Sequence, residues 1–264
     1  MAGSVERIFA ITVVILYLFT SLSLVRMKGV ILAGGSGTRL KPLTKVTSKQ
    51  LLPVYDHPMV YYPLQTLLKA GITDILVITA AEHAGDYLKY LGSGREFGAR
   101  FTYEIQEEPK GLAQALGMAE HFADDHAVSM ILGDNIFEDD CSSSIKKFKK
   151  GAMIFVKEVP DPERFGVVEL DRKGAVRSIQ EKPKHPKSHY AQTGLYVYDA
   201  SVFARIKKQK PSARGELEIT DLNNTYLREG LLKGVVVRGE WIDAGTFDSL
   251  LYASNFIARK SNKQ

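Results

Sequence analysis

A glycine-rich segment that ends in an arginine could hold a chain of phosphates. Residues 30–43 read VILAGGSGTRLKPL, so an apolar run stops at Ala33 and glycines follow before Thr38 and Arg39. Glycines there let backbone N–H groups approach an anion without obstruction by a Cβ atom. The arginine adds a planar, permanently charged fork that suits phosphate oxygens. The plainer alternative is a tight glycine turn beside a solvated arginine.

Three common motifs are excluded by residues of this segment. A dinucleotide-binding fingerprint needs a third glycine where Leu40 stands, and a Walker loop needs a Gly-Lys-Ser/Thr sequence that the segment lacks. A nucleophile elbow around Ser36 needs a glycine in place of Thr38. The segment therefore belongs to none of these three classes.

Two aspartates and a lysine elsewhere in the chain could complete a phosphate site. Asp134 and Asp243 each follow a short apolar run, so both come at the ends of predicted strands. Two carboxylates beside a phosphate loop could hold a hard divalent cation, which prefers oxygen ligands. Lys49 lies in SKQLLPV, just before an apolar turn. Taken singly, such aspartates more commonly serve turns or helix caps, and such a lysine lies at the surface.

The elements that must position these residues alternate between strand and helix in the first half of the chain. Short β-branched runs bounded by turn residues predict strands at 28–33, 74–79, 100–105 and 127–132. The stretches between them predict helices at 59–70, 83–91 and 112–122. Near-continuous apolar strands separated by helices are typical of a parallel sheet covered on both faces. Ligands bind beyond the carboxyl ends of such strands, where the glycine segment and Asp134 fall.

After Asp134 the pattern becomes that of antiparallel strands. We expect strands at 152–159, 166–171, 175–181 and 191–199, with a turn at 172–174 joining two of them. Further helices are expected at 201–208, 219–229 and 246–259. No repeat or low-complexity linker interrupts the chain, so we expect one α/β unit with an antiparallel insertion.

The composition is that of an ordinary globular protein. Of the 264 residues, 45% are apolar and 25% are charged. The net charge of +5 suits small anions as well as a polyanion. The single cysteine, Cys141, excludes an intramolecular disulfide and a cysteine metal cluster, and it indicates a reducing, cytosolic setting. The lysine- and arginine-rich runs at 146–150 and 205–210 predict solvated helix ends, so we expect no nucleic-acid partner.

The first 26 residues differ from the rest of the chain. Ile8–Val25 carries no charge and is flanked by Arg7 and Arg26. It is marginally long enough for a membrane span, which needs about 20 residues. A helix that left a bilayer there would have too short a connection to the strand at Lys28. We therefore expect residues 1–26 to come from an upstream start codon wrongly included, with a membrane tether as the alternative, and the folded domain to be 27–264.

A set of longer motifs resembles one known family. In chain order the motifs are LAGGSGTRL, SKQLLPV, GLAQAL, LGDNIF, ERFGVVEL, QEKP, TGLYVYD, SARGELEITDLN and WIDAGTFDSLL. Together they resemble the sugar-1-phosphate nucleotidyltransferases, and most closely the branch that uses dTTP and glucose 1-phosphate. The resemblance runs from Met27 almost to the C-terminus. It implies a Rossmann-like three-layer α/β fold, with a mostly parallel central sheet and an antiparallel sugar-binding insertion.

The resemblance also implies a role for each matching residue. The nucleotide would contact the glycine segment and two residues that read the pyrimidine edge: Leu32, Ala33, Gly34, Gly35, Ser36, Gly37, Thr38, Gln106 and Gly111. The catalytic cations would be Arg39, Lys49 and Lys182. The sugar phosphate would contact Asn135, Gly166, Glu181, Lys182, Gly194 and Tyr196. Asp134 and Asp243 would share Mg²⁺.

The implied reaction transfers a nucleotidyl group from dTTP to glucose 1-phosphate in the cytoplasm, with release of pyrophosphate. A uridylyltransferase with the same residues and a non-catalytic sugar-nucleotide sensor are the alternatives. The family also implies a homo-oligomer, although its longer members build subunit contacts and a regulatory site with helices beyond the last one predicted here. We expect no membrane partner unless residues 1–26 belong to the native protein.

A chain that begins at Met27 is expected to be soluble and fully active. The first core strand begins at Lys28, and its N-terminal end lies opposite the predicted ligand edge of the sheet. The full-length chain is expected to aggregate or to need detergent, because an exposed apolar run of this length promotes association. The measurement is pyrophosphate release by both chains, with light scattering. Misfolding of the shorter chain would show that residues 1–26 are part of the fold.

Overall fold

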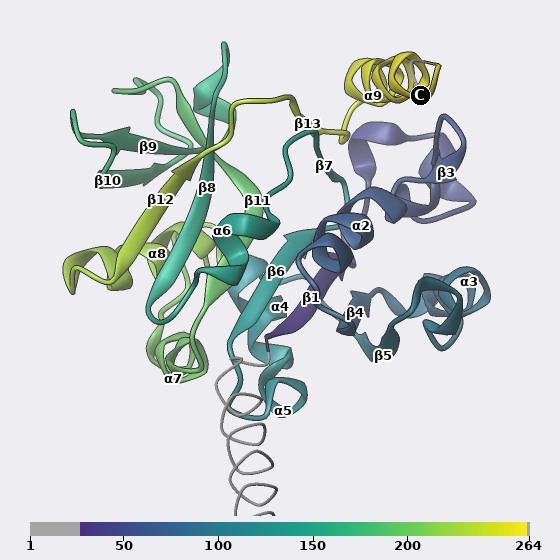
Figure 1. Cartoon of the computed structure of the whole chain (residues 1–264), viewed down its shortest axis with the longest axis horizontal. Coiled ribbons are helices and arrows are strands. Elements are labelled where there is room, and N and C mark those ends of the chain that lie inside the picture. Colours follow the sequence, from purple (N-terminus) through teal and green to yellow (C-terminus); the bar gives the residue numbers. More distant parts are fainter. Residues whose placement is uncertain (1–26, 263–264) are drawn as a thin grey trace, which may run out of the picture.

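A nine-stranded sheet runs through the protein, and the computed structural model describes residues 27–262 (Figure 1). Its strands are β1 Lys28–Ala33, β4 Asp74–Thr79, β5 Arg100–Ile105, β6 Val128–Leu132, β8 Ala152–Glu158, β9 Gly166–Leu170, β10 Val176–Glu181, β11 Tyr190–Tyr198 and β12 Leu232–Val236. The expectations for residues 1–26 lie outside the described residues.

The sheet has a parallel half and a largely antiparallel half, as the sequence predicts. The strand order is β10-β9-β11-β6-β1-β4-β5, and β6, β1, β4 and β5 are mutually parallel. β11 joins the halves, because it pairs antiparallel with β6, with β8 and with β9. The carboxyl ends of β1 and β6 therefore lie at one edge of the sheet, close to the middle of β11.

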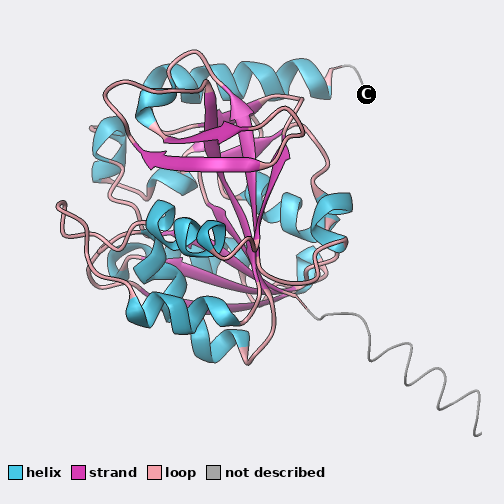
Figure 2. Ribbon diagram, turned by 90° about the vertical axis from the view of Figure 1, so that its left-hand side faces the viewer, coloured by secondary structure: helices cyan, strands magenta, loops and turns pink. Residues whose placement is uncertain are grey.

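Side chains of the parallel strands alternate between two apolar cores. On β1, Val30 and Leu32 face one core while Ile31 and Ala33 face the other, as expected for a sheet covered on both sides. Figure 2 shows the helices on both faces of the strands. The first core contains α4 Leu112–Met118, α5 Glu120–Ala123, α7 Ser201–Lys208 and α8 Ile219–Arg228. The second contains α2 Tyr61–Lys69, α3 Ala84–Leu91 and α6 Ser142–Lys146.

Two small sheets lie at the ligand edge. β2 Pro53–Val54 pairs with β3 His57–Pro58, and β7 Asn135–Phe137 pairs antiparallel with β13 Trp241–Asp243. In the second pair Asp243 stands opposite Asn135, and the backbone N–H of Ala244 donates to the carbonyl of Asp134 at 3.0 Å. Segments more than a hundred residues apart in the chain thus bring the two predicted acidic residues together.

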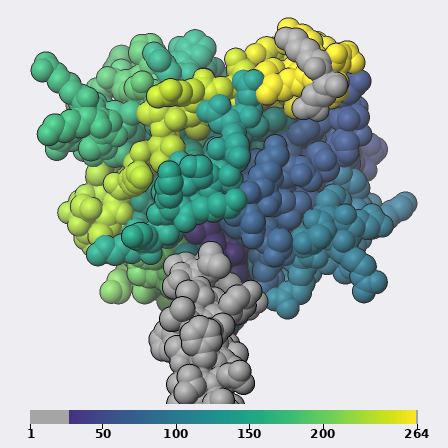
Figure 3. Space-filling model, in the orientation of Figure 1, coloured from purple at the N-terminus to yellow at the C-terminus, as the bar shows by residue number. Residues whose placement is uncertain are grey.

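The last helix covers a third, smaller core. α9 Phe247–Ser261 packs on Val54, Ile136 and Ile242 through residues that include Ala253, and in Figure 3 it lies against the N-terminal third of the chain. The Thr246 hydroxyl accepts from the backbone N–H of Ser249, and the Ser249 hydroxyl accepts from that of Thr246. This capping box fixes the start of the helix just after Asp243.

Besides the short strands β2, β3 and β7, which were not expected, the structure differs from the sequence prediction in two places. The predicted helix 112–122 is wrong as a single element, since it divides into α4 and α5 at Ala119. Gly117 lowers the helix propensity there. The second difference is β12, which pairs parallel with β8 inside the half expected to be antiparallel.

No helix within residues 27–262 has the length and apolar content of a membrane span.

Candidate active site

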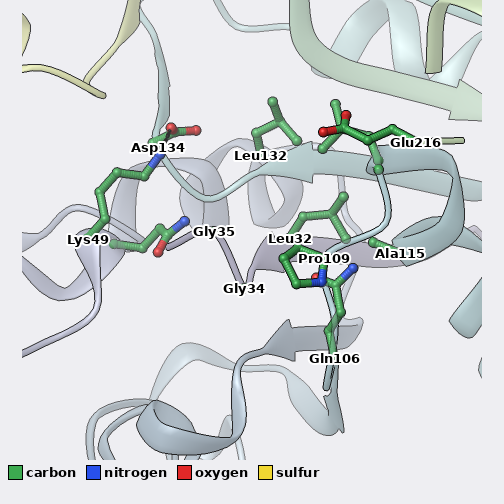
Figure 4. Close-up of a pocket in the computed structure, with 13 residues that line it drawn as sticks. Leu32, Gly34, Gly35, Lys49, Gln106, Pro109, Ala115, Leu132, Asp134 and Glu216 are labelled. Atoms are coloured by element: carbon green, nitrogen blue, oxygen red, sulfur yellow. Dashed lines mark hydrogen bonds and ion pairs between the residues drawn. The ribbon is translucent and has the colours of Figure 1, made fainter. Parts of the chain in front are cut away.

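Two adjoining cavities open at the carboxyl ends of β1 and β6. The smaller, of about 240 Å³, is lined by Leu32, Gly34, Gly35, Lys49, Gln50, Gln106, Pro109, Gly111, Leu112, Ala115, Leu132, Asp134 and Glu216 (Figure 4). The larger, of about 780 Å³, is lined by Gly35, Ser36, Arg39, Leu112, Leu132, Asp134, Asn135, Arg164, Phe165, Gly166, Glu181, Lys182, Gln192, Thr193, Gly194, Tyr196, Glu216, Ile219, Trp241 and Asp243. Asp134 faces both, so it lies at their junction.

The glycine segment forms the wall between the cavities. Gly35 contributes to both of them, and Ser36 and Arg39 to the larger one. Gly37 has a left-handed backbone with φ of 59°, and its carbonyl accepts from the Thr44 hydroxyl at 2.9 Å. A Cβ atom at Gly37 would lie 2.8 Å from the Thr44 side chain, so this turn requires glycine.

Three residues of the predicted nucleotide set line neither cavity. They are Ala33, Gly37 and Thr38, judged over the described part of the chain. The Ala33 side chain instead packs in the core beneath the sheet. The assignment of these three to the nucleotide therefore stays a prediction.

The acidic residues and the lysine meet at the junction of the cavities. The Lys49 ammonium forms an ion pair with Oδ2 of Asp134, and 11% and 10% of the two side chains are exposed. Figure 4 shows Lys49 reaching Asp134 along the cavity wall. Arg39 lies beside Asp243, since a Cβ atom on Gly245 would be 2.7 Å from Nη2 of Arg39 and 3.0 Å from Oδ1 of Asp243. Two cations thus accompany two carboxyl groups.

The two carboxyl groups titrate in opposite directions. Burial disfavours the charge of Asp134, but the ion pair with Lys49 and hydrogen bonds hold its pKa below the ordinary value. Burial and the neighbouring negative charge of Asp134 raise the pKa of Asp243 to about 7, although Lys49 and Arg39 act against the rise. At neutral pH and without a bound cation, Asp134 is therefore ionised and Asp243 is partly protonated. A divalent cation would stabilise the ionised form of both.

Asn135 holds this junction together. Its Oδ1 accepts from the backbone N–H of Gly194 at 2.8 Å and from Nε1 of Trp241 at 2.7 Å, and its Nδ2 donates to Oδ1 of Asp134 at 3.0 Å. Only 1% of the residue is exposed. One buried amide therefore ties β11 and β13 to Asp134, and its oxygen already accepts two hydrogen bonds.

The residues expected to read a pyrimidine lie at the far end of the smaller cavity. Gln106 follows β5, and its Nε2 donates to Oε1 of Gln114 at 2.7 Å, which orients the amide. Gly111 has φ of 105°, and a Cβ atom there would lie 2.5 Å from the carbonyl of Leu217. Leu217 is in turn bonded to the backbone of Lys110 and Ala113, so this end of the cavity is held by two crossing loops.

The residues expected to bind a sugar phosphate line the larger cavity. The Glu181 carboxylate accepts from the Thr220 hydroxyl at 2.5 Å, and Lys182 follows it with its Nζ 3.9 Å from Oε1 of Glu181. Lys182 has φ of 40°, unusual for a residue with a side chain, and its N–H donates to the carbonyl of Phe165 at 3.0 Å. Gly166, Gly194 and the almost buried Tyr196 complete this wall.

Several lining residues were missed by the sequence reasoning. Arg164 adds a cation to the larger cavity, and Gln50 and Glu216 face the smaller one. All three lie inside the quoted motifs ERFGVVEL, SKQLLPV and SARGELEITDLN, so the signal was present without an assigned role. Over residues 27–262 no group of three or more histidine, cysteine or acidic side chains could hold a metal. The acidic pair would need phosphate and water oxygens to complete a coordination sphere.

Comparison with known proteins gives consistent matches over almost the whole chain. The sequence profile described as Nucleotidyl transferase matches residues 28–260. Glucose-1-phosphate thymidylyltransferase of Neisseria gonorrhoeae is 51% identical over 244 residues, covering 90% of this chain and 85% of the relative. The Mycolicibacterium smegmatis protein of that name is 53% identical over 237 residues, covering 88% and 82%.

Solved structures agree with these matches. A Bacillus anthracis protein of the same name, crystallised with sucrose, superposes with a TM-score of 0.84 at 52% identity, covering 87% of this chain and 94% of that one. A UDP-glucose pyrophosphorylase in complex with UDP-glucose gives a TM-score of 0.79 at 25% identity, covering 89% and 99%. The three-layer fold expected from the sequence is therefore confirmed.

The unfolding free energy of the metal-free protein is expected to depend on pH through Asp243. The pKa of its carboxyl rises from an ordinary value of 3.8 to about 7 in the folded state. Between these values the folded state binds more protons than the unfolded state, so stability falls as pH rises. Asp243→Asn removes this contribution, and wild type should lose stability relative to the variant over that window. Urea unfolding with EDTA measures it; parallel curves for the two proteins would contradict the carboxyl pairing.

Proposed function

This chain belongs to the nucleotidyl transferase family, and from that premise we propose that it transfers a thymidylyl group from dTTP to glucose 1-phosphate, releasing pyrophosphate. The observation that carries the proposal is the junction of the two cavities. There the carboxyl groups of Asp134 and Asp243 lie with Lys49 and Arg39, between a narrow cavity and a wide one. A reaction that joins two phosphate-bearing substrates needs its charges at such a junction.

The narrow cavity is the proposed nucleotide site. Leu32, Leu132 and Ala115 offer it an apolar surface for a base, and Gln106 offers an amide that can hydrogen-bond the pyrimidine edge. The backbone of the glycine segment and the cations Arg39 and Lys49 would then contact the triphosphate. This assignment is supported by Gly34, whose missing Cβ leaves room for Oε1 of Gln106 beside the loop.

The wide cavity is the proposed sugar-phosphate site. Glu181 would accept hydrogen bonds from sugar hydroxyl groups, and Lys182 would bind the phosphate. Arg164, which also lines the cavity, brings a further cation to the same anion. Gly194 leaves room for Asn135 in the wall of this cavity, because a Cβ atom there would lie 2.5 Å from Oδ1 of Asn135 and displace it.

The proposed chemistry needs positioning and charge rather than a protein nucleophile. An oxygen of the sugar phosphate is already anionic at neutral pH, so it can attack the α-phosphorus without a general base. Arg39, Lys49 and Lys182 offset the charge of two anions that would otherwise repel each other. Asp134 and Asp243 fit Mg²⁺ by their oxygen chemistry and by their unfavourable proximity without a cation. Bound Mg²⁺ supplies further charge neutralisation between nucleotide and sugar phosphates.

The same junction disfavours a non-catalytic sensor. A sensor could lose the cations or the acidic pair without losing binding, whereas this chain keeps Arg39, Lys49, Lys182, Asp134 and Asp243.

We further propose that the enzyme acts in the cytoplasm as a homo-oligomer whose domain begins at Met27. Sedimentation of the purified protein with and without residues 1–26 tests the oligomeric state and the start of the domain.

Loss of either acidic residue is expected to lower turnover by roughly 100-fold or more, because each would hold the Mg²⁺ that offsets phosphate charge. The variants are Asp134→Asn and Asp243→Asn, and Arg39→Ala should be similarly damaging. Pyrophosphate release from dTTP and glucose 1-phosphate is the measurement. Lys147→Ala, at an exposed helix end, is the matched control for loss of a cation. Equal losses in Arg39→Ala and Lys147→Ala would point to general electrostatics and against the site.

The preference for dTTP over UTP is expected to be modest, about 10-fold in kcat/KM. The two bases differ by a methyl group, and Gln106 can hydrogen-bond an edge that both present. Measuring kcat/KM for each nucleotide at saturating glucose 1-phosphate decides the matter. A higher value with UTP would favour the uridylyltransferase alternative and leave the mechanism unchanged.

A further inference from the structure

A row of buried polar side chains leads from the apolar core to the wall of the wide cavity. It begins at Tyr198 on β11, continues through Asn223 on α8, Gln192 on β11 and Thr220 on α8, and ends at the Glu181 carboxylate. The first four residues are 0%, 0%, 5% and 1% exposed. We call these five residues the polar row.

The first four members of the polar row each donate one hydrogen bond toward the cavity. The Tyr198 hydroxyl donates to Oδ1 of Asn223 at 2.7 Å, and Nδ2 of Asn223 donates to Oε1 of Gln192 at 2.7 Å. Nε2 of Gln192 then donates to the Thr220 hydroxyl at 2.8 Å, which donates to Oε2 of Glu181 at 2.5 Å. The row therefore has a single direction from beginning to end.

The carboxylate end dictates this direction. An ionised Glu181 can only accept, so the Thr220 hydroxyl must give it its hydrogen and accept from the next residue. Gln192 must then present its amide N–H₂ to Thr220 and its oxygen to Asn223. By the same logic Asn223 presents nitrogen to Gln192 and oxygen to Tyr198. The orientation of both buried amides thus follows from one charge.

The tyrosine end reinforces the same direction. Tyr198 stacks between Tyr196, at a centroid distance of 6.2 Å, and Tyr226, at 5.8 Å, within the apolar core. Asn223 is its one hydrogen-bond partner among the described residues. If the row reversed, the phenolic hydrogen would be buried without an acceptor, which is unfavourable. Burial also raises the pKa of Tyr198 well above its ordinary value, which keeps the hydrogen in place.

Glu181 lines the wide cavity, and the polar row leaves its other oxygen, Oε1, without a partner from the row. Oε1 accepts a long hydrogen bond of 3.5 Å from Nη2 of Arg214 and lies 3.9 Å from Nζ of Lys182, and both cations are partly exposed. Because the row occupies Oε2, a ligand meets a carboxylate of fixed orientation that can only accept. Gly166 makes room for the row, since a Cβ atom there would overlap Nε2 of Gln192.

We propose that the polar row is a specificity device: Tyr198, Asn223 and Gln192 are positioning residues that hold Glu181 as a pure acceptor, so that the enzyme requires a hydrogen-bond donor on the hexose at the position that meets Oε1. The inference rests on the proposed function and deepens it. The sugar phosphates accepted are those with a hydroxyl group at that position, and analogues that lack the hydroxyl are rejected.

The first test compares glucose 1-phosphate with its 2-, 3-, 4- and 6-deoxy analogues. With wild type, removal of the one hydroxyl that meets Oε1 should lower kcat/KM by roughly 10- to 100-fold, since Oε1 of Glu181 then keeps only its long hydrogen bond from Arg214. Gln192→Glu has nearly the same shape but cannot donate, so Thr220 is drawn to the new carboxylate and away from Glu181. The penalty for the same deoxy position should fall to about 3-fold or less, while KM for dTTP stays unchanged.

A matched pair of tyrosine variants separates this role from simple packing. Tyr198→Phe removes the hydroxyl that begins the row, whereas Tyr226→Phe removes one from the same aromatic cluster outside the row. The Tyr226 hydroxyl contacts Ser201 and Asp199 instead. Both variants should show similar small losses in melting temperature. Only Tyr198→Phe should reduce the deoxy-sugar penalty and raise KM for glucose 1-phosphate.

The outcomes are distinguishable. If wild type makes no pyrophosphate from dTTP and glucose 1-phosphate, the proposed function fails first. If it does but shows no deoxy-sugar penalty, Glu181 does not select a hydroxyl and the inference is overturned. If both Gln192→Glu and Tyr198→Phe fold, judged by their melting curves, and keep the wild-type penalty, the row does not control selectivity. A reduced penalty in Tyr226→Phe equal to that in Tyr198→Phe would assign the effect to core packing.

Discussion

The forced proximity of two carboxyl groups governs the ligand edge of this protein. Asp134 and Asp243 are brought together by backbone pairing between β7 and β13, far from each other in the chain. Burial and the negative charge of Asp134 together raise the pKa of Asp243, at about 1.4 kcal/mol for each pKa unit. A fold without a ligand gains nothing from such a pair. The carboxyl pair becomes favourable when a cation arrives with the substrates.

The surrounding structure serves to hold that pair in place. Lys49 neutralises Asp134, and the buried amide of Asn135 fixes the same carboxyl group while bonding to β11 and to Trp241. Behind the wide cavity a second buried set orients Glu181. Both arrangements use amides that donate on one side and accept on the other, so each holds one carboxylate in one orientation. The carboxylates of the ligand edge are thus oriented by buried polar groups that lie behind them.

Much of the fold could be predicted because the parallel strands carry a strong local signal. Strands 28–33, 74–79 and 100–105 begin and end where the apolar β-branched runs do. β12 carries no such signal, since it contains Lys233 and Gly234 and is only partly buried. β7 and β13 have three residues each, too few for any periodicity. Asp243 was expected at the end of a strand, but β7 and its pairing with β13, which place Asp243 opposite Asn135, were not predicted.

The sequence could predict most of the residues that line the candidate site, but fewer of the hydrogen bonds between them. The quoted motifs contain nearly every lining residue, including Arg164 and Glu216, which had no assigned role. Asn135 was expected to line the sugar site, but no sequence pattern indicates that its amide is occupied by Gly194 and Trp241. Hydrogen bonds between side chains distant in sequence depend on tertiary register. A linear motif records which residue types are needed and not what they touch.

The threefold pairing of β11 has a consequence for how the protein can move. Its first residues pair with β9 and β8, and its last residues pair with β8 and β6, so one continuous strand belongs to the parallel half of the sheet and to the largely antiparallel half. Hinge bending between the halves would have to break this shared ladder. The loops at 106–111 and 212–217 lie outside the ladder and are bonded to each other through Leu217. A displacement of one loop would therefore carry the other with it, while the ladder holds the two halves in place.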